Sequence, residues 1–492
     1  MDKSKKKSNV KNNNTNKTMS KKISGGYNKE ILGVVYAFVA IFILLISYFL
    51  YFLTFESGKI INNSMNARLD NFAQWTVRGD IADRNGNILV TTNTNDDNEK
   101  RVYNYGELFA HVIGYIEQGK TGIEAEANFY LLSSNINPFD KLSNRLSGEK
   151  SLGDSVYTTL DLDLQRIAYE ELGDRRGAVV VMEPDTGKIL AMVSKPGFNP
   201  NELAMLWPSL IAEDNKEANL LNRASQGLYP PGSIFKIITA LTYIRQNPTS
   251  YSTYAFECHG TITDAEGNTI RCYNNTSHGN IDLRGSFAKS CNTSFGNIGV
   301  NTNLDVLRQT GEDFLFNNEL PLSFPYNRSR MPISSLDSNW EALQTAIGQG
   351  KTQVTPLHMA MLVSAIANGG ILMNPYLIDK VESVNGNEVK KFFPTSYGTL
   401  ISANEAAILK DYMTAVVTEG TARPLQNTNY QAAGKTGSAE FEYGKESHAW
   451  FIGYAPNDNP KIAVSIIVEE GGIGSGAAVN IARKLFDAYL IR

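Results

Sequence analysis

Cysteine is scarce in this chain of 492 residues, where it occurs only as Cys258, Cys272 and Cys291. Three cysteines are too few for the disulfide framework of a small secreted scaffold, although Cys258 and Cys272 could form one disulfide bond if they lie outside the cell. Cys291 is expected to be a small buried side chain. An excess of positive charge is missing as well, since the formal net charge is -4. The composition therefore gives no indication of nucleic-acid binding.

The first 30 residues differ from the rest because they carry nine lysines against Asp2 and Glu30. An uncharged, largely apolar run follows over residues 31–55. At about 1.5 Å per residue, this run is long enough to cross a hydrocarbon core of about 30 Å. We predict a Lys-rich cytoplasmic tail over residues 1–30 and a transmembrane signal-anchor helix over 31–55. By the positive-inside rule, everything that follows lies outside the cytoplasm. A cleaved signal peptide is the alternative, but its apolar region is usually only about 7–15 residues long.

The polar stretch after the apolar run is rich in turn signals and predicts a small α+β module. Arg84-Asn85-Gly86-Asn87 has the composition of a hairpin turn between short strands at 80–82 and 88–90. Between Gly148 and Gly153 the composition changes to that of a linker. We therefore predict an N-terminal pedestal domain over residues 56–153 and a second domain over residues 154–492.

The second domain begins and ends with apolar strands and has helical periodicity between them. Apolar runs at 178–182 and 189–193 flank a Pro-Asp-Thr-Gly turn and predict a buried antiparallel hairpin. Helices are predicted over 234–244, 357–367, 405–417 and 477–490, and strands over 448–454 and 461–468. This order favours an α+β fold in which an antiparallel sheet is flanked by helices.

The strongest chemical signal is Ser233-Ile234-Phe235-Lys236, which follows Pro230-Pro231-Gly232. Pro-Pro-Gly turns the chain, and Ser233 then begins an apolar helix on which residues i and i+3 share a face. A serine hydroxyl needs a neighbouring base to become a nucleophile, and a lysine whose pKa is lowered by burial can be that base. The pattern Ser-x-x-Lys also occurs by chance, as at Ser4 and Lys7, so it is weak evidence alone.

Two further patterns follow in the chain, Ser290-Cys291-Asn292 and Lys435-Thr436-Gly437. Their order after Ser-x-x-Lys is the signature set of serine β-lactamases and penicillin-binding proteins. Lys435-Thr436-Gly437 precedes a predicted strand at 448–454, which suits an edge strand that lines a cleft. Together these elements predict an active site built from three distant segments.

The chain from about Val156 onward resembles a penicillin-binding transpeptidase domain along nearly its whole length. Upstream, Arg78-Gly79-Asp80-Ile81-Ala82-Asp83-Arg84 and Thr121-Gly122-Ile123-Glu124 are similar to the N-terminal signature of the class B penicillin-binding proteins. The resemblance is to the short members of that class. Supporting stretches are Asn222-Arg223-Ala224, Ala346-Ile347-Gly348-Gln349-Gly350, Thr355-Pro356-Leu357 and His448-Ala449-Trp450-Phe451.

The resemblance implies a D,D-transpeptidase that acts on peptidoglycan stem peptides ending in D-Ala-D-Ala. It implies that Ser233 is acylated, that Lys236 accepts the Ser233 proton, and that Ser290 relays a proton to the leaving D-Ala amine. Asn292 would bind the substrate backbone and contact Lys236. β-Lactams would acylate the same serine and inhibit the enzyme.

The resemblance further implies that Lys435 and Thr436 hold the terminal carboxylate and that Gly437 allows close approach to the substrate. The peptide N–H groups of Ser233 and Ser438 would form the oxyanion hole. No metal or organic cofactor is implied, and His278 and His448 are expected to be structural.

The segment before the catalytic domain has no glycosyltransferase motif, so the resemblance implies a SEDS-type membrane glycosyltransferase as partner. Two alternatives stay open at this point. A D,D-carboxypeptidase would use water in place of an acceptor amine. A membrane-anchored β-lactamase of class A would need a Glu-x-x-Leu-Asn pattern after Ser290, and Glu319-Leu320-Pro321 matches it poorly.

Overall fold

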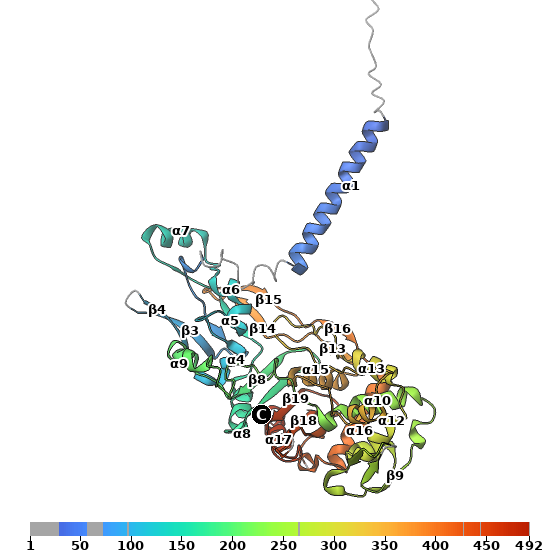
Figure 1. Cartoon of the computed structure of the whole chain (residues 1–492). Coiled ribbons are helices and arrows are strands. Elements are labelled where there is room, and N and C mark those ends of the chain that lie inside the picture. The colour runs from blue at the N-terminus through green and yellow to red at the C-terminus, as the bar shows by residue number, and fades with distance from the viewer. Residues whose placement is uncertain are drawn as a thin grey trace, which may run out of the picture. The chain divides into compact units, whose positions relative to one another are not determined.

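The computed structural model describes residues 29–56, 72–95, 98–263, 266–426, 428–442 and 444–491 (Figure 1). The chain divides into two compact units, residues 1–61 and 62–492. In the first unit, α1 (Lys29–Tyr51) is followed by the π-helical turn η1 (Phe52–Glu56). α1 buries none of its residues and is long and apolar enough to cross a membrane. The predicted tail lies outside the described residues, apart from its last two.

The second unit contains a six-stranded mixed sheet with the strand order β15-β14-β6-β2-β3-β4. Its strands are β2 (Ile81–Ala82), β3 (Ile88–Asn95), β4 (Asn98–Tyr103), β6 (Ser155–Thr158), β14 (Ile378–Glu382) and β15 (Glu388–Lys391). The predicted turn at 84–87 joins β2 to β3, which are antiparallel, whereas β2 and β6 are parallel. The hairpin β14–β15, orange in Figure 1, joins strands from far earlier in the chain. The sheet thus draws on both sides of the predicted 153/154 boundary, which stays a prediction.

Short helices and a two-stranded parallel sheet complete the pedestal. They are η2 (Gly106–Phe109), α4 (Ala110–Ile113), α5 (Gly122–Glu126), α6 (Asn128–Leu132), α7 (Pro138–Ser147), β1 (Thr76–Val77) and β5 (Ser151–Leu152). α5 carries the buried Glu124, which accepts hydrogen bonds from Arg78 Nε at 2.6 Å and Arg101 Nε at 2.7 Å. The two class B signature stretches, at 78–84 and 121–124, therefore meet at one buried ionic cluster.

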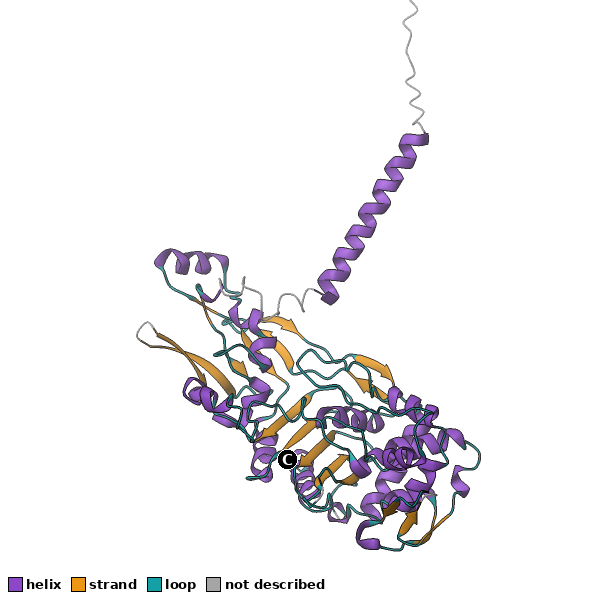
Figure 2. Ribbon diagram, viewed as in Figure 1, coloured by secondary structure: helices purple, strands orange, loops and turns teal. Residues whose placement is uncertain are grey.

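A five-stranded antiparallel sheet, in the order β17-β18-β19-β7-β8, forms the centre of the catalytic domain (Figure 2). Its strands are β7 (Gly177–Met182), β8 (Ile189–Lys195), β17 (Ala433–Ala439), β18 (His448–Ala455) and β19 (Ile462–Val468). Every residue of β7, β18 and β19 is buried, so the sheet is covered on both faces. This explains why these strands are continuous apolar runs. The predicted hairpin and the predicted edge position of β17 are confirmed.

Helices pack on the sheet and form an adjoining helical region. α15 (Pro356–Ala367) packs on β7, β18 and β19, while α8 (Leu162–Leu172) and α17 (Ala477–Leu490) pack on each other and on the same sheet. All twelve residues of α15 are buried, as expected for a helix that is apolar all round. The remaining helices are η3 (Pro200–Glu202), α9 (Leu203–Leu210), η4 (Gly232–Phe235), α10 (Lys236–Gln246), η5 (Tyr251–Thr253), η6 (Tyr273–Asn275), α11 (Leu283–Ala288), α12 (Asn292–Val300), α13 (Leu304–Asp313), α14 (Asn339–Ala346), α16 (Ala403–Thr418) and η7 (Arg423–Leu425).

Besides β1–β5, the described residues form three further two-stranded sheets outside the two larger ones. They pair β9 (Phe256–Cys258) with β12 (Gly279–Ile281), β10 (Thr261–Thr263) with β11 (Thr269–Arg271), and β13 (Ile371–Met373) with β16 (Ser396–Thr399). The predicted α+β class, with an antiparallel sheet between helices, is thus confirmed.

Candidate active site

Ser233 lies in the short 3₁₀ turn η4, directly before α10. Gly232 has a left-handed φ of 54°, which a side chain would disfavour. Its N–H donates to the Gly348 carbonyl at 2.8 Å, and Trp450 Nε1 donates to the Pro230 carbonyl at 3.0 Å. The chain around the serine is therefore fixed from two sides, while Ser233 itself is only half-buried and can be reached from solvent.

Lys236 is the first residue of α10 and is completely buried. In a 3₁₀ turn, residues i and i+3 lie one above the other, so Lys236 is on the same face as Ser233. Its Nζ donates to the Ser290 carbonyl at 2.8 Å, to Asn292 Oδ1 at 2.7 Å and to Ser290 Oγ at 3.3 Å. Burial lowers the pKa of Lys236 to about 7, so a large fraction of the side chain is neutral near neutral pH.

Ser290 and Asn292 flank the start of α12, just after α11. Ser290 has a φ of 55°, an uncommon value for a residue with a side chain and one that is concentrated at functional sites. Asn292 uses its oxygen for Lys236 and donates its Nδ2 to the Arg271 carbonyl at 2.9 Å. The motif is therefore held both by Lys236 of α10 and by the segment that contains Arg271.

Lys435 bonds the same Ser290 hydroxyl as Lys236 does. Its side chain is fully buried on the edge strand β17, and its Nζ donates to Ser290 Oγ at 2.9 Å and to the Thr436 carbonyl at 3.0 Å. Burial, followed by the charge of Lys236, lowers the pKa of Lys435 well below its usual value. Ser290 Oγ thus lies between two buried amines, an arrangement suited to moving a proton.

Gly437 and Ser438 bring the backbone of β17 against the serine turn. A Cβ on Gly437 would lie 3.1 Å from the Pro231 carbonyl oxygen, and one on Gly232 would lie 2.6 Å from that of Ser438. Only glycines permit this approach. The backbone at Ser438 is therefore adjacent to the backbone at Ser233, the neighbourhood that a two-donor oxyanion hole requires.

The structure brings all eight predicted site residues into one region, and it adds three that were not predicted. Thr421, in the turn after α16, shares a hydrogen bond with the Thr436 hydroxyl. Gly348 receives the Gly232 hydrogen bond, and Trp450 holds Pro230. His448 is buried, accepts a hydrogen bond from the Glu470 N–H through Nδ1 and stacks on Phe441, which agrees with its expected structural part.

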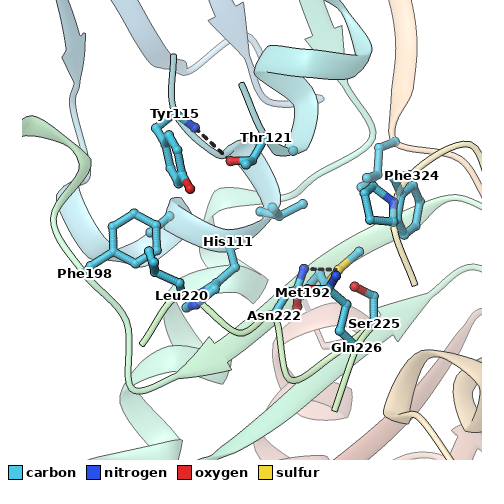
Figure 3. Close-up of a pocket in the computed structure, with 15 residues that line it drawn as sticks. His111, Tyr115, Thr121, Met192, Phe198, Leu220, Asn222, Ser225, Gln226 and Phe324 are labelled. Atoms are coloured by element: carbon cyan, nitrogen blue, oxygen red, sulfur yellow. Dashed lines mark hydrogen bonds between the residues drawn. The ribbon is translucent and has the colours of Figure 1, made fainter. Parts of the chain in front are cut away.

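A separate cavity lies where the pedestal meets the catalytic domain (Figure 3). His111 and Tyr115 of the pedestal side and Phe198, Asn222 and Phe324 of the catalytic side are among the residues that line it. None of its lining residues belongs to the three motifs, so this cavity is distinct from the site around Ser233.

Comparison with known families decides the identity of the fold. Residues 177–487 match the model of the penicillin-binding protein transpeptidase domain, and residues 78–156 match that of the penicillin-binding protein A dimerisation domain. The chain belongs to the class B penicillin-binding proteins. It is therefore a transpeptidase and a serine acyl-transferase, as the resemblance predicts. The relatives favour this activity over the alternatives of a carboxypeptidase or a β-lactamase.

Similar proteins span nearly the whole length of this penicillin-binding protein. The peptidoglycan D,D-transpeptidase PbpA of Mycolicibacterium smegmatis is 30% identical over 94% of this chain and 99% of its own length. Penicillin-binding protein A of M. tuberculosis, solved as a ceftriaxone acyl-enzyme, has a TM-score of 0.78 at 30% identity and covers 86% of this chain and 100% of its own. The D,D-transpeptidase domain of a peptidoglycan glycosyltransferase from Eggerthella lenta has a TM-score of 0.76 at 32% identity, covering 85% and 100%.

Proposed function

We propose that this penicillin-binding protein cross-links peptidoglycan stem peptides through an acyl-enzyme on Ser233, and that β-lactams acylate the same hydroxyl. The observation that carries the proposal is the position of Ser290 Oγ between Lys236 Nζ at 3.3 Å and Lys435 Nζ at 2.9 Å. Ser233, one 3₁₀ turn before Lys236, is half-buried, so solvent can reach its hydroxyl.

Acylation begins with neutral Lys236. Ser233 Oγ attacks the carbonyl of the penultimate D-Ala while its proton passes to Lys236 Nζ, which the low pKa of that amine permits. The resulting oxyanion is stabilised by the N–H groups of Ser233 and Ser438. When the tetrahedral intermediate collapses, the peptide C–N bond breaks, Ser290 Oγ gives its proton to the leaving D-Ala amine, and Lys236 Nζ returns the proton that it took from Ser233 to Ser290 Oγ.

Transfer repeats these steps in reverse order. The amine of a second stem peptide attacks the ester carbonyl, gives up its proton through Ser290 and Lys236, and displaces Ser233 Oγ. Ser233 recovers its proton, and a new peptide bond replaces the one that was broken. Asn292 holds Lys236 through its Oδ1 during both halves of the reaction, and we assign it to the substrate backbone as well.

The terminal carboxylate of the donor peptide is assigned to Lys435, Thr436 and the backbone of Gly437. Lys435 is buried beside Lys236, which disfavours its charged form in the free enzyme. A carboxylate placed against it would favour the ammonium form, so binding of the correct substrate would itself charge the site. A charge-assisted bond of this kind is stronger than a neutral one.

We further propose that α1 anchors the protein in the cell membrane with its Lys-rich tail in the cytoplasm and the catalytic domain outside. The length of α1, its lack of buried residues and the lysines before it support this. Glycan strands would then come from a SEDS-type membrane glycosyltransferase, since the described folded part consists of a pedestal and a transpeptidase domain.

The test uses the full-length protein in detergent and a fluorescent penicillin, with intact mass followed over hours. We expect one stable adduct in the wild type and none in Ser233→Ala. Ser4→Ala, which removes the serine of another Ser-x-x-Lys match, is the matched control and should label like the wild type. A donor peptide with an added amine acceptor then yields the cross-linked product. Labelling of Ser233→Ala would contradict the assignment of the nucleophile, and release of D-Ala without transfer would favour a carboxypeptidase.

A further inference from the structure

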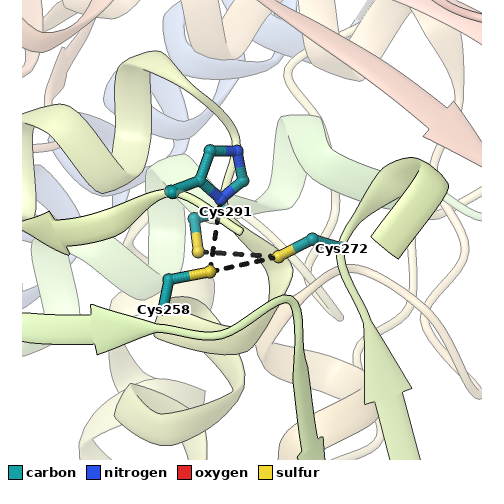
Figure 4. Close-up of side chains that lie close together, drawn as sticks. Cys258, Cys272 and Cys291 are labelled. Carbon is teal, nitrogen blue, oxygen red and sulfur yellow. Dashed lines mark hydrogen bonds between the residues drawn. The ribbon is translucent and has the colours of Figure 1, made fainter. Parts of the chain in front are cut away.

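Behind the Ser290 motif, four side chains that can bind a metal face one another (Figure 4). They are the thiols of Cys258, Cys272 and Cys291 and the imidazole of His278, and all four ligand atoms lie within 4.8 Å of one another. The three cysteines are buried and free, with Sγ–Sγ distances of 3.8 Å for Cys258 to Cys272 and 3.7 Å for Cys272 to Cys291. Cys258 and Cys272 are thus well beyond disulfide bond length, about 2.05 Å.

The spacing of these atoms fits a tetrahedral metal ion. Zinc bonds to sulfur at about 2.3 Å and to imidazole nitrogen at about 2.0 Å, so two sulfurs on one tetrahedral zinc lie about 3.8 Å apart and a sulfur and a nitrogen about 3.5 Å apart. The Cys258 Sγ to His278 Nδ1 distance is 3.3 Å. The Cys258–Cys272 and Cys272–Cys291 sulfur pairs match the first value closely, and the Cys258–His278 pair lies near the second.

The surroundings of the sulfurs are those of a closed structural site. The Thr293 hydroxyl lies 3.2 Å from Cys258 Sγ, 3.5 Å from Cys272 Sγ and 3.3 Å from Cys291 Sγ. The Ser294 N–H donates to Cys291 Sγ at 3.4 Å. Donors of this kind orient metal-bound thiolates and stabilise their charge.

The segment that supplies the ligands has very little apolar core of its own. Its buried cluster consists of the three cysteines and Ile281, with Phe256 packed against it, and it is separate from the main core. The sheets β9–β12 and β10–β11 have only three residues per strand, and two-stranded sheets of this size are marginal in water. Small folds that lack a core are commonly held by a metal or a disulfide.

We infer that Cys258, Cys272, His278 and Cys291 bind one Zn²⁺ ion in a closed four-coordinate site that fixes Ser290 and Asn292 in the active site. Three thiolates and one imidazole in a tetrahedron are a ligand set typical of structural zinc. This revises the expectation that Cys291 is only a filler and that the chain holds no metal.

The proposed metal site is joined directly to the active site through the chain. Cys291 stands between Ser290 and Asn292 in the chain, and its side chain caps α12. Cys272 follows Arg271, whose carbonyl accepts the Asn292 amide. A metal that joins Cys272 to Cys291 would therefore hold the Arg271 carbonyl and Asn292 in place relative to each other. Asn292 in turn accepts a hydrogen bond from Lys236. The zinc would position the active-site residues without contacting substrate, since its four ligands leave no position for one. This effect on Ser290 and Asn292 rests on the proposed function.

The first test is metal content. Full-length protein, purified in detergent under reducing conditions, is analysed by mass spectrometry of the elements, and we expect one zinc per chain. Cys272→Ser and His278→Ala should lose the metal. His259→Ala is the matched control, because His259 is exposed, neighbours Cys258 and lies outside the cluster, and it should keep one zinc per chain. Protein that is free of metal and carries a Cys258–Cys272 disulfide would overturn the inference, as would iron or copper bound in place of zinc.

A second measurement needs no variant that might fail to fold. Titration of the wild type with a thiol-modifying mercurial should release one zinc as three thiols react, and Co²⁺ put in place of zinc should show the thiolate-to-cobalt absorption of a tetrahedral site. Modification of three thiols without release of zinc would contradict the site.

The positioning effect is tested by acylation. Removing the metal with a chelator should slow penicillin acylation about 10²-fold, the size expected for a displacement near 1 Å, and added zinc should restore it. Acylation that is unchanged in metal-free protein would overturn the positioning part. Ser233→Ala should bind zinc but form no adduct, so failure of the metal site and failure of the proposed nucleophile give different results.

Discussion

Arg78 Nε and the Glu124 carboxylate lie 2.6 Å apart in the interior of the pedestal, 46 positions apart in the chain. Arg101 bonds the other carboxylate oxygen at 2.7 Å, and Glu124 is completely buried. Arg78 Nη1 also donates to Asn128. A carboxylate with two guanidinium partners thus ties β4 and α5 to the chain before β2.

Removing the carboxylate should destabilise the pedestal strongly. In Glu124→Gln, two buried guanidinium groups lose their counter-charge, and breaking such a pair typically costs about 3–5 kcal/mol. Glu117→Gln, on an exposed position of the same domain, should change stability by less than about 0.5 kcal/mol. Urea denaturation followed by far-UV circular dichroism measures both. Equal midpoints for the two variants would show that the cluster adds no stability.

The same cluster predicts a loss of stability in acid. Burial alone would raise the pKa of Glu124, but Arg101 and Arg78 outweigh it and hold that pKa below its ordinary value of 4.5. The stability that the charged group contributes is therefore fully present above about pH 4.5 and is lost as the pH falls through the lower folded-state value. The difference in stability between wild type and Glu124→Gln should be constant near neutral pH and shrink in acid. A difference that grows in acid would contradict this sign.

Much of the fold and of the site could be predicted because the signals were local. The continuous apolar runs of β7 and β8 and the turn between them indicated the hairpin, and the order of three short motifs indicated the site. The contacts that were not predicted join residues that lie far apart in the chain. Trp450 and Pro230 are 220 positions apart, and nothing near either residue indicates their hydrogen bond.

The cysteine cluster escaped for a different reason. Its ligands come from a strand end, two loops and a helix cap, and their spacing, with 13, 5 and 12 residues between successive ligands, has no Cys-x-x-Cys pair. Cys258 and Cys272 suggested a disulfide, and Cys291 was expected only to be a small buried side chain within the Ser290-Cys291-Asn292 motif. Only the folded chain shows that Cys291 faces the other two.

The pKa of Lys236 predicts how acylation depends on pH. Burial lowers the pKa of Lys236 to about 7. If its neutral amine accepts the Ser233 proton, as proposed, the rate of penicillin acylation should rise with pH through about 7 and then level off. The titratable groups that face this amine are Lys435, Cys291 and Cys272. Stopped-flow measurement of adduct formation gives the profile. A rate that is flat between about pH 6 and pH 8 would exclude Lys236 as the base.

Replacing Lys236 by arginine tests whether Lys236 acts as a proton acceptor or only supplies a positive charge. In Lys236→Arg the guanidinium stays protonated throughout this range, so acylation should fall about 10²–10⁴-fold and lose its rise near pH 7. Thermal unfolding of the variant checks that the fold persists. Near-wild-type acylation by Lys236→Arg would mean that a fixed charge is enough.

The last prediction concerns the glycine that holds the serine turn. Gly348 has a φ of 76°, and a Cβ placed on it would lie 2.0 Å from the Gly232 carbonyl oxygen, a contact that must push η4 aside. Gly386 has the same φ of 76° in the turn between β14 and β15, but a Cβ there would meet nothing within 4 Å. The two positions share their backbone strain and differ only in the neighbouring atoms.

Gly348→Ala should therefore slow acylation about 10²-fold, because Ser233 moves relative to Lys236 and the oxyanion donors. Gly386→Ala should acylate at the wild-type rate and lose only the stability that a left-handed alanine costs, about 1 kcal/mol. Rates of penicillin adduct formation and thermal midpoints are measured for both variants. If both acylate normally, the Gly348 contact does not set the position of the nucleophile; if both are slow, backbone strain rather than contact with Gly232 is responsible.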